Sequence, residues 1–262
     1  MKKNMPDGMT ESESQLSMGD LVIDKTNPEG LRLALELAKT YYYGESNRAA
    51  FLGINVNLGE LWCFSYKWPS GKIPYAFDGY PESAKKYVQE CMDEWEEGSD
   101  NSISFKETKS FNWWRNIWWN AGLLKVLKIR QKTHEGVSGL STPGYCPRPF
   151  MDIDKKSLNI KSTLRHELGH VLGLQHEFDR YDRDDYIIIK DGMSWEDFSV
   201  GWFARLFING LENYDYDSVM NYTSRYYKKN EDGSKGILIE SPVIDYISQG
   251  DKNGIKYIYK KN

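Results

Sequence analysis

Three of the chain's four histidines lie within eleven residues of each other, and their spacing constrains the local fold more than any other feature. His166 and His170 are four residues apart, so on a helix their imidazoles lie one above the other and can share a metal ion. A straight helix would carry residue 176 away from that ion. Gly173 can adopt the left-handed conformation that ends a helix, so we predict that the chain turns back there and brings His176 to the same metal.

The donor set of this cluster predicts the kind of metal site. Structural zinc sites are usually closed by four ligands and rich in cysteine, whereas three imidazoles leave a coordination position for water. We therefore expect one catalytic Zn²⁺, which lowers the pKa of its water to about 7. Glu167, directly after the first ligand, is expected to be the general base that takes the water's proton. The alternative is a zinc ion that only holds the fold together.

Composition excludes several other kinds of protein. The chain has 38 acidic and 34 basic residues without a long run of either sign, so we expect no nucleic-acid partner. No stretch approaches the roughly 20 apolar residues that a membrane span requires. The N-terminal lysines are not followed by an apolar segment, so no secretory signal is recognised. The three cysteines, Cys63, Cys91 and Cys146, allow one disulfide at most.

Periodicity and turn residues predict the other elements. The first 20 or so residues are polar and predict a mobile leader. Apolar residues at helical spacing predict helices over residues 28–44, 81–97 and 157–173. Short apolar runs predict strands over residues 73–77, 103–107 and 125–130. Residues 178–220 have no clear period and predict an irregular second lobe.

The segment between the last two predicted strands holds four of the nine tryptophans, Trp113, Trp114, Trp118 and Trp119. If they were exposed together, such a patch would mark a contact site. Tryptophan is mostly buried on average, however, so we expect an insertion that packs its rings on the core. His134, the histidine outside the cluster, is expected to be a solvated loop residue.

The string HELGHVLGLQHE, residues 166–177, resembles the signature of the metzincin clan, and Glu177 after the third histidine points to the astacin family within it. Four further segments resemble that family in the same order along the chain: WPSGKIPYAF at 68–77, RYDRDDYIII at 180–189, SVMNY at 218–222 and ISQGDKNGIKYIY at 247–259. Asn221 departs from the family's usual histidine, and three cysteines cannot form its two disulfides. The chain therefore resembles a bacterial-type member.

The resemblance implies an α+β metzincin fold, zincin-like in outline. It has an upper lobe with a twisted five-stranded mixed sheet and helices, an irregular lower lobe, and the active-site helix between them. It implies a zinc-dependent endopeptidase that hydrolyses internal bonds of protein or peptide substrates held in an extended conformation. Met220 would form the hydrophobic floor beneath the zinc, Tyr222 would stabilise the oxyanion, and Glu177 would hydrogen-bond toward the N-terminus of the mature enzyme. Secretion is expected.

The N-terminal region resembles a prosegment at two points. SMGD at residues 17–20 is weakly similar to the zymogen motif whose aspartate binds zinc, and RAAFLG at 48–53 is similar to the start of mature family enzymes. We therefore expect residues 1–48 to be a leader or prosegment and residues 49–262 to be the astacin-like catalytic domain. Cys63 is a rival to Asp20 as the latency residue, because thiolates bind zinc well. Three functions stay open: an active endopeptidase, a latent zymogen blocked by Asp20 or Cys63, and a non-catalytic zinc-bearing binding protein.

Overall fold

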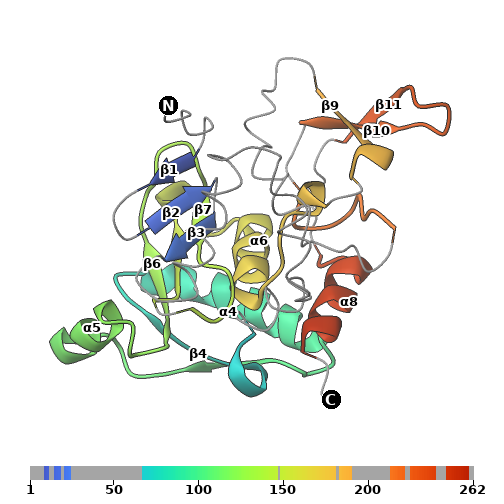
Figure 1. Cartoon of the computed structure of the whole chain (residues 1–262). Helices are drawn as coiled ribbons and strands as arrows, with labels where there is room; N and C mark the ends of the chain where they lie inside the picture. The colour runs from blue at the N-terminus through green and yellow to red at the C-terminus, as the bar shows by residue number, and fades with distance from the viewer. Residues whose placement is uncertain are drawn as a thin grey trace, which may run out of the picture.

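The computed structural model describes residues 9–11, 15–18, 21–24, 67–146, 148–180, 183–190, 213–221, 225–239 and 246–259. Most of the large mixed sheet lies on one side of the central helix α6 (Lys161–Leu172), and a smaller sheet and the last helix lie on the other (Figure 1). The long helix α4 (Glu82–Gly98) packs against α6. None of the helices in these ranges has the length and apolar character needed to cross a bilayer.

The large sheet has the strand order β1-β2-β3-β7-β8-β6-β4-β5. Its last five strands are β4 (Lys72–Phe77), β5 (Ser104–Glu107), β6 (Leu127–Gln131), β7 (Gly139–Ser141) and β8 (Phe150–Ile153). Four of these run in parallel, and β7 is antiparallel to its neighbour β8. The expected five-stranded mixed sheet of an α+β metzincin fold is confirmed, with strand bounds close to the three that periodicity predicted.

Three further strands extend this sheet beyond β7. They are β1 (Met9–Glu11), β2 (Gln15–Met18) and β3 (Leu21–Asp24). They form an antiparallel meander, and β3 pairs in parallel with β7, with Leu21 opposite Ser141. The prediction of a mobile leader over the first 20 or so residues is therefore wrong for β1 and β2. They pair in turn onto β3, which lies on the backbone edge of β7, and composition does not reveal such pairing. The helix predicted over residues 28–44 lies outside the described residues.

Helix α4 (Glu82–Gly98) forms as predicted, because Ala84, Val88, Cys91 and Trp95 make one apolar stripe that is buried. It packs against α6 (Lys161–Leu172), where the indole Nε1 of Trp95 donates to the Arg165 carbonyl oxygen at 3.2 Å. Helix α6 begins later than predicted, because residues 155–157 form a separate 3₁₀ turn. The 3₁₀ turn η2 (Pro69–Gly71) precedes β4, and the 3₁₀ turn η3 (Lys155–Ser157) precedes α6.

The part of the chain after Gly173 has more regular structure than predicted. Its elements are η4 (Glu177–Asp179), η5 (Arg183–Asp185), β9 (Ile187–Ile189), β10 (Tyr226–Lys229), β11 (Lys235–Leu238) and α8 (Gln249–Ile258). The three strands form an antiparallel sheet, and a Ser248–Asp251 capping box begins α8. The Tyr259 hydroxyl donates to the Leu172 carbonyl oxygen at 3.0 Å, which ties the end of the chain to the end of α6.

Two expectations about side chains are wrong. In helix α5 (Trp113–Asn120) only Trp119 is buried, at 6% exposure, whereas Trp113, Trp114 and Trp118 are 66%, 62% and 54% exposed. Helical geometry explains this, because one narrow face of a short helix reaches the core and the remaining rings point away from it. His134 is half-buried instead of solvated, because its Nε2 lies 2.9 Å from Asp152 Oδ2.

Candidate metal centre

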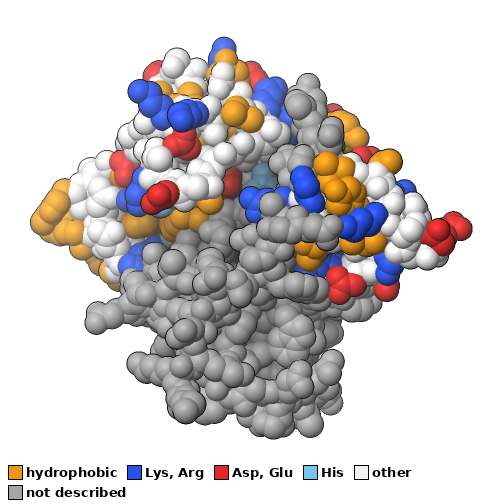
Figure 2. All heavy atoms as spheres, turned by 90° about the horizontal axis from the view of Figure 1, so that it is seen from above, with side chains coloured by type: hydrophobic (Ala, Val, Ile, Leu, Met, Phe, Trp, Pro, Cys, Tyr) orange, Lys and Arg blue, Asp and Glu red, His pale blue; other side chains and the backbone are white. Residues whose placement is uncertain are grey.

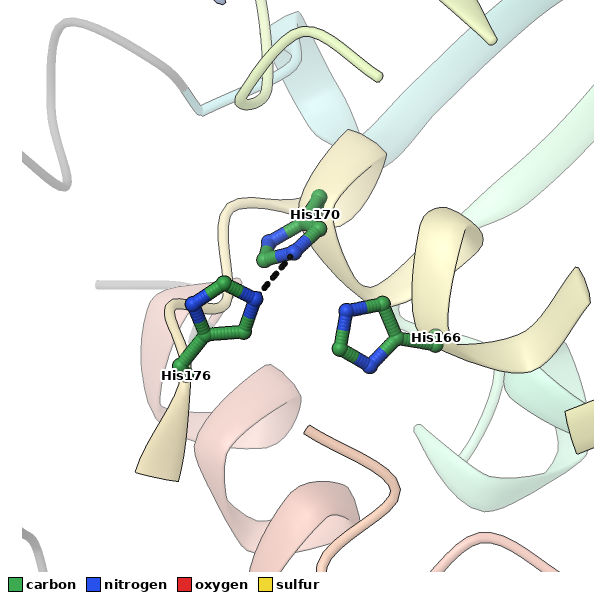
Figure 3. Close-up of side chains that lie close together, drawn as sticks. All are labelled: His166, His170 and His176. Carbon is green, nitrogen blue, oxygen red and sulfur yellow. Dashed lines mark hydrogen bonds between the residues drawn. The ribbon is translucent and has the colours of Figure 1, made fainter. Parts of the chain in front are cut away.

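Helix α6 and the turn after it bring the three predicted histidines together. Gly173 has φ 105° and ψ 4°, and its amide caps the helix by donating to the His170 carbonyl oxygen at 2.8 Å. The predicted left-handed turn at Gly173 is confirmed. One ring nitrogen from each imidazole lies within 4.8 Å of the other two, and the Nε2 atoms of His170 and His176 are 3.1 Å apart (Figure 3).

Backbone carbonyls fix the orientation of two of these rings. Nδ1 of His166 lies 2.8 Å from the carbonyl oxygen of Val219, and Nδ1 of His170 lies 2.9 Å from that of Leu174. A carbonyl oxygen only accepts hydrogen bonds, so each Nδ1 carries the proton. The lone pair of each neutral imidazole is then on Nε2, which is the tautomer that binds a metal.

The donor chemistry of this cluster fits zinc. The three histidines are 9%, 0% and 4% exposed, and they form the one group of potential ligands found among the described residues. Zinc takes imidazole nitrogen readily, and three protein ligands without a cysteine are typical of an open catalytic site. Figure 2 shows histidine surface in a recess near the middle of the molecule.

Glu167 lies beside the cluster and is held by strand β7. Its side chain is 2% exposed, and Ser141 Oγ donates to its Oε2 at 2.6 Å. Gly139, two residues earlier on the same face of β7, leaves space for the carboxylate, since a Cβ built there would lie 2.5 Å from Oε1. Sequence reasoning missed both residues, because a strand of three residues is too short to show an alternating pattern.

The turn at residues 218–221 packs against α6 and contacts His166. Met220 is 2% exposed and packs so tightly against Gly169 of α6 that a Cβ on that glycine would overlap the methionine sulfur. Asp251, at the start of α8, accepts hydrogen bonds from Ser218 Oγ at 2.6 Å and from the Val219 amide at 2.9 Å. The same turn therefore supports the helix through Met220 and orients His166 through Val219.

The carboxylate of Glu177 is largely enclosed in this region, since its side chain is 19% exposed. Its Oε1 accepts from Arg180 Nη1 at 2.7 Å and from the Asp215 amide at 2.9 Å. Burial raises the pKa of Glu177 to about 7, against the lowering effect of these two partners. The side chain of Asn221 is held by two hydrogen bonds, since its Oδ1 accepts from the hydroxyls of Tyr214 and Tyr226. Three other predicted site residues, Asp20, Cys63 and Tyr222, lie outside the described residues.

The sheet and the three-histidine site together are typical of zinc metalloendopeptidases. The model of the peptidase family described as Astacin matches residues 148–256, which include the histidine cluster and the turn beneath it. Over these residues the chain is similar to the astacin family.

Curated relatives are similar over parts of their length. Embryonic protein UVS.2 of Xenopus laevis is 34% identical over 109 residues, which cover 41% of this chain and 20% of that protein. Nematocyst expressed protein 6 of Nematostella vectensis is 26% identical over 209 residues, which cover 75% of this chain and 66% of that protein. The chain thus spans from about a fifth to about two thirds of the length of these relatives.

Solved structures show the same fold. The high choriolytic enzyme 1 of Oryzias latipes, a hatching enzyme zinc-protease, aligns with a TM-score of 0.55 at 17% identity and covers 76% of this chain and 96% of its own. Myroilysin aligns with a TM-score of 0.51 at 19% identity and covers 76% and 97% of the two chains. At these identities the likeness concerns the fold alone.

Proposed function

We propose that the protein hydrolyses internal peptide bonds of protein substrates, with His166, His170 and His176 holding one zinc ion and Glu167 acting as the general base. The observation that carries the proposal is the convergence of three imidazole nitrogens within 4.8 Å next to a buried carboxylate. Zinc bound there would supply Lewis-acid chemistry, by lowering the pKa of a water molecule toward about 7 and polarising the scissile carbonyl.

The residues of the chain have separate roles in this reaction. Glu167 takes a proton from the attacking water on its carboxylate and passes it to the nitrogen of the departing amine. The hydrogen bond from Ser141 supports this role, because it restricts the carboxylate to one orientation. By resemblance to the family, the Tyr222 hydroxyl stabilises the oxyanion, and its proximity to Val219 and Met220 in the sequence supports this assignment.

The substrate would bind as an extended strand. Strand β7 is the edge of the five-stranded sheet and contacts α6 directly, so a peptide paired with β7 would run past Glu167. Main-chain hydrogen bonds to such an edge give affinity for extended peptides of many sequences. We expect the substrates to be proteins met outside the cell, in line with the expected secretion.

The test replaces Glu167 with Gln, which keeps the size and removes the base. Cleavage of casein should fall about 10²-fold to 10⁴-fold, whereas the exposed Glu107→Gln variant on β5 should keep full activity. A chelator should abolish cleavage by the parent protein, and added zinc should restore it. Unchanged cleavage after Glu167→Gln, with zinc still bound, would falsify the mechanism. A chain starting at Ala49 that binds zinc but cleaves nothing would favour the non-catalytic binding protein.

A second candidate function is latency, and the pairing of β3 with β7 favours it. Strand β3 occupies the edge at which we expect substrate, and Leu21 lies opposite the Ser141 that hydrogen-bonds Glu167. Asp20 directly precedes Leu21 in the sequence, so this register supports Asp20 over Cys63 as the residue that blocks the zinc. We infer that residues 1–48 form an inhibitory prosegment.

Two comparisons test latency. The chain starting at Ala49 should cleave casein faster than the whole chain, and equal rates would refute an inhibitory prosegment. Within the whole chain, Asp20→Asn should raise activity and Cys63→Ser should not. The reverse result would assign the latency to Cys63.

A further inference from the structure

Helix α5 carries its apolar residues on the outside of the molecule. Successive residues of a helix are about 100° apart, so Trp113, Trp114, Ile117 and Trp118 fall on one continuous side. Their exposures are 66%, 62%, 41% and 54%, and Leu123 just after the helix is 65% exposed. We call these five residues the tryptophan patch. In Figure 1, α5 projects from the end of the sheet far from α6, and Figure 2 shows hydrophobic side chains protruding at the same edge.

The opposite side of α5 is firmly attached to the fold. Trp119 is buried, its Nε1 donates to the Val126 carbonyl oxygen at 3.1 Å, and the Lys128 ammonium lies 4.0 Å above its ring. The Asn112 side chain caps the helix by accepting from the Arg115 amide at 2.9 Å. The outward direction of the tryptophan patch is therefore built into the helix and its anchor.

The sequence around the patch is basic although the chain is acidic. Residues 106–125 hold Lys106, Lys109, Arg115 and Lys125 against the single acid Glu107, a local charge of +3 in a chain with a net charge of -4. Each of these four basic side chains is at least partly exposed. A binding partner that contacts both the tryptophan rings and the basic side chains must offer an apolar region to the rings and negative charges around it.

We propose that the tryptophan patch binds the surface of an anionic lipid bilayer. Tryptophan favours the membrane interface, because its ring is apolar and its N–H remains able to donate. An amphipathic helix with tryptophan on one side and basic residues beside it lies in that interface and gains from anionic headgroups. The patch is convex and carried on a projecting helix, so it suits a lipid layer, which adapts its shape, better than a protein partner, which would need a matching pocket. Helix α5 lies away from α6 in Figure 1, so a bilayer that held α5 would not cover the helix that carries His166 and His170.

The test measures co-sedimentation of the full chain with phosphatidylcholine vesicles, with and without phosphatidylglycerol. The protein should bind the anionic vesicles more tightly, and salt should weaken the binding. The triple variant Trp113→Ser, Trp114→Ser, Trp118→Ser should have an affinity for vesicles at least about tenfold lower than that of the parent. Its melting temperature should be unchanged, because the three rings are exposed. Lys106→Gln with Lys109→Gln should reduce the preference for anionic vesicles.

A matched control replaces two exposed apolar residues elsewhere, Ile237→Ser with Tyr257→Ser, which are 74% and 57% exposed. This variant should bind vesicles as the parent protein does. Absence of vesicle binding by the parent, or equal binding by the triple variant, would overturn the proposal. A third outcome is that neither protein binds vesicles, and that on gel filtration the parent elutes as a dimer and the triple variant as a monomer. This result would overturn the proposal and show that the patch joins two copies of the chain.

Discussion

Gly139→Ala should inactivate the enzyme without unfolding it. The new Cβ would lie 2.5 Å from Oε1, 2.6 Å from Cγ and 2.7 Å from Cδ of Glu167, whereas ordinary contact begins at 3.4 Å. The carboxylate must therefore move by about 1 Å, and misplacement of a reacting group by about 1 Å lowers the rate roughly 100-fold. We expect kcat to fall by about that factor with a smaller change in KM.

The stability of this variant should stay near that of the parent. Gly139 is not among the residues with positive φ, so alanine fits its backbone conformation. The atoms that must move belong to the side chain of Glu167 and not to the backbone, and alanine reduces the entropy of the unfolded chain by an amount worth about 0.4–1 kcal/mol, which offsets part of the cost. The predicted defect is in catalysis alone.

The assay measures kcat and KM on a fluorogenic peptide, zinc content and thermal unfolding, all with the chain starting at Ala49. Gly98→Ala on α4 is the matched control, since its Cβ would meet the flexible aliphatic chain of Lys252 far from the metal site. A Gly139→Ala variant that binds zinc and keeps the parent kcat would refute the argument that β7 positions Glu167. Loss of folding would refute the separation of stability from activity.

Three further outcomes are expected. The free energy of unfolding in urea titrations should fall as the pH rises from about 4.5 to about 7, because the raised pKa of Glu177 shows that the folded state disfavours its charged form, and Glu177→Gln should remove part of this fall. Gly169→Ala should lower the melting temperature, because Met220 must leave its position under α6; an unchanged melting temperature would contradict this packing. Cys91, whose pKa burial raises to about 12, should resist iodoacetamide at pH 8 in the native protein and react after denaturation, as peptide mass spectrometry would show.

The features that sequence predicted well are those whose physical cause is local. The spacing of His166 and His170 and the conformational freedom of Gly173 act over a few residues, so the cluster and its turn follow from the string itself. Helix α4 was predicted to within a residue, because its apolar stripe repeats over four turns.

The features that sequence missed depend on contacts between distant segments. Ser141 and Gly139 matter because β7 lies next to α6, and three residues carry no signal of that pairing. The strands β1 to β3 form on the edge of β7, which a polar composition does not predict. The tryptophan rings were expected to pack on the core because tryptophan is mostly buried on average. That average does not take into account which side of a short helix faces the core.

The carbonyl oxygen that orients His166 belongs to Val219, 53 residues further along the chain. During synthesis the helix and all three imidazoles leave the ribosome well before this acceptor does. A nascent chain or a fragment that stops before Val219 thus has every metal ligand but lacks the group that fixes the first ring. Tight zinc binding should appear only after the turn at residues 218–221 has docked, so the metal site would report that the second half of the domain has folded.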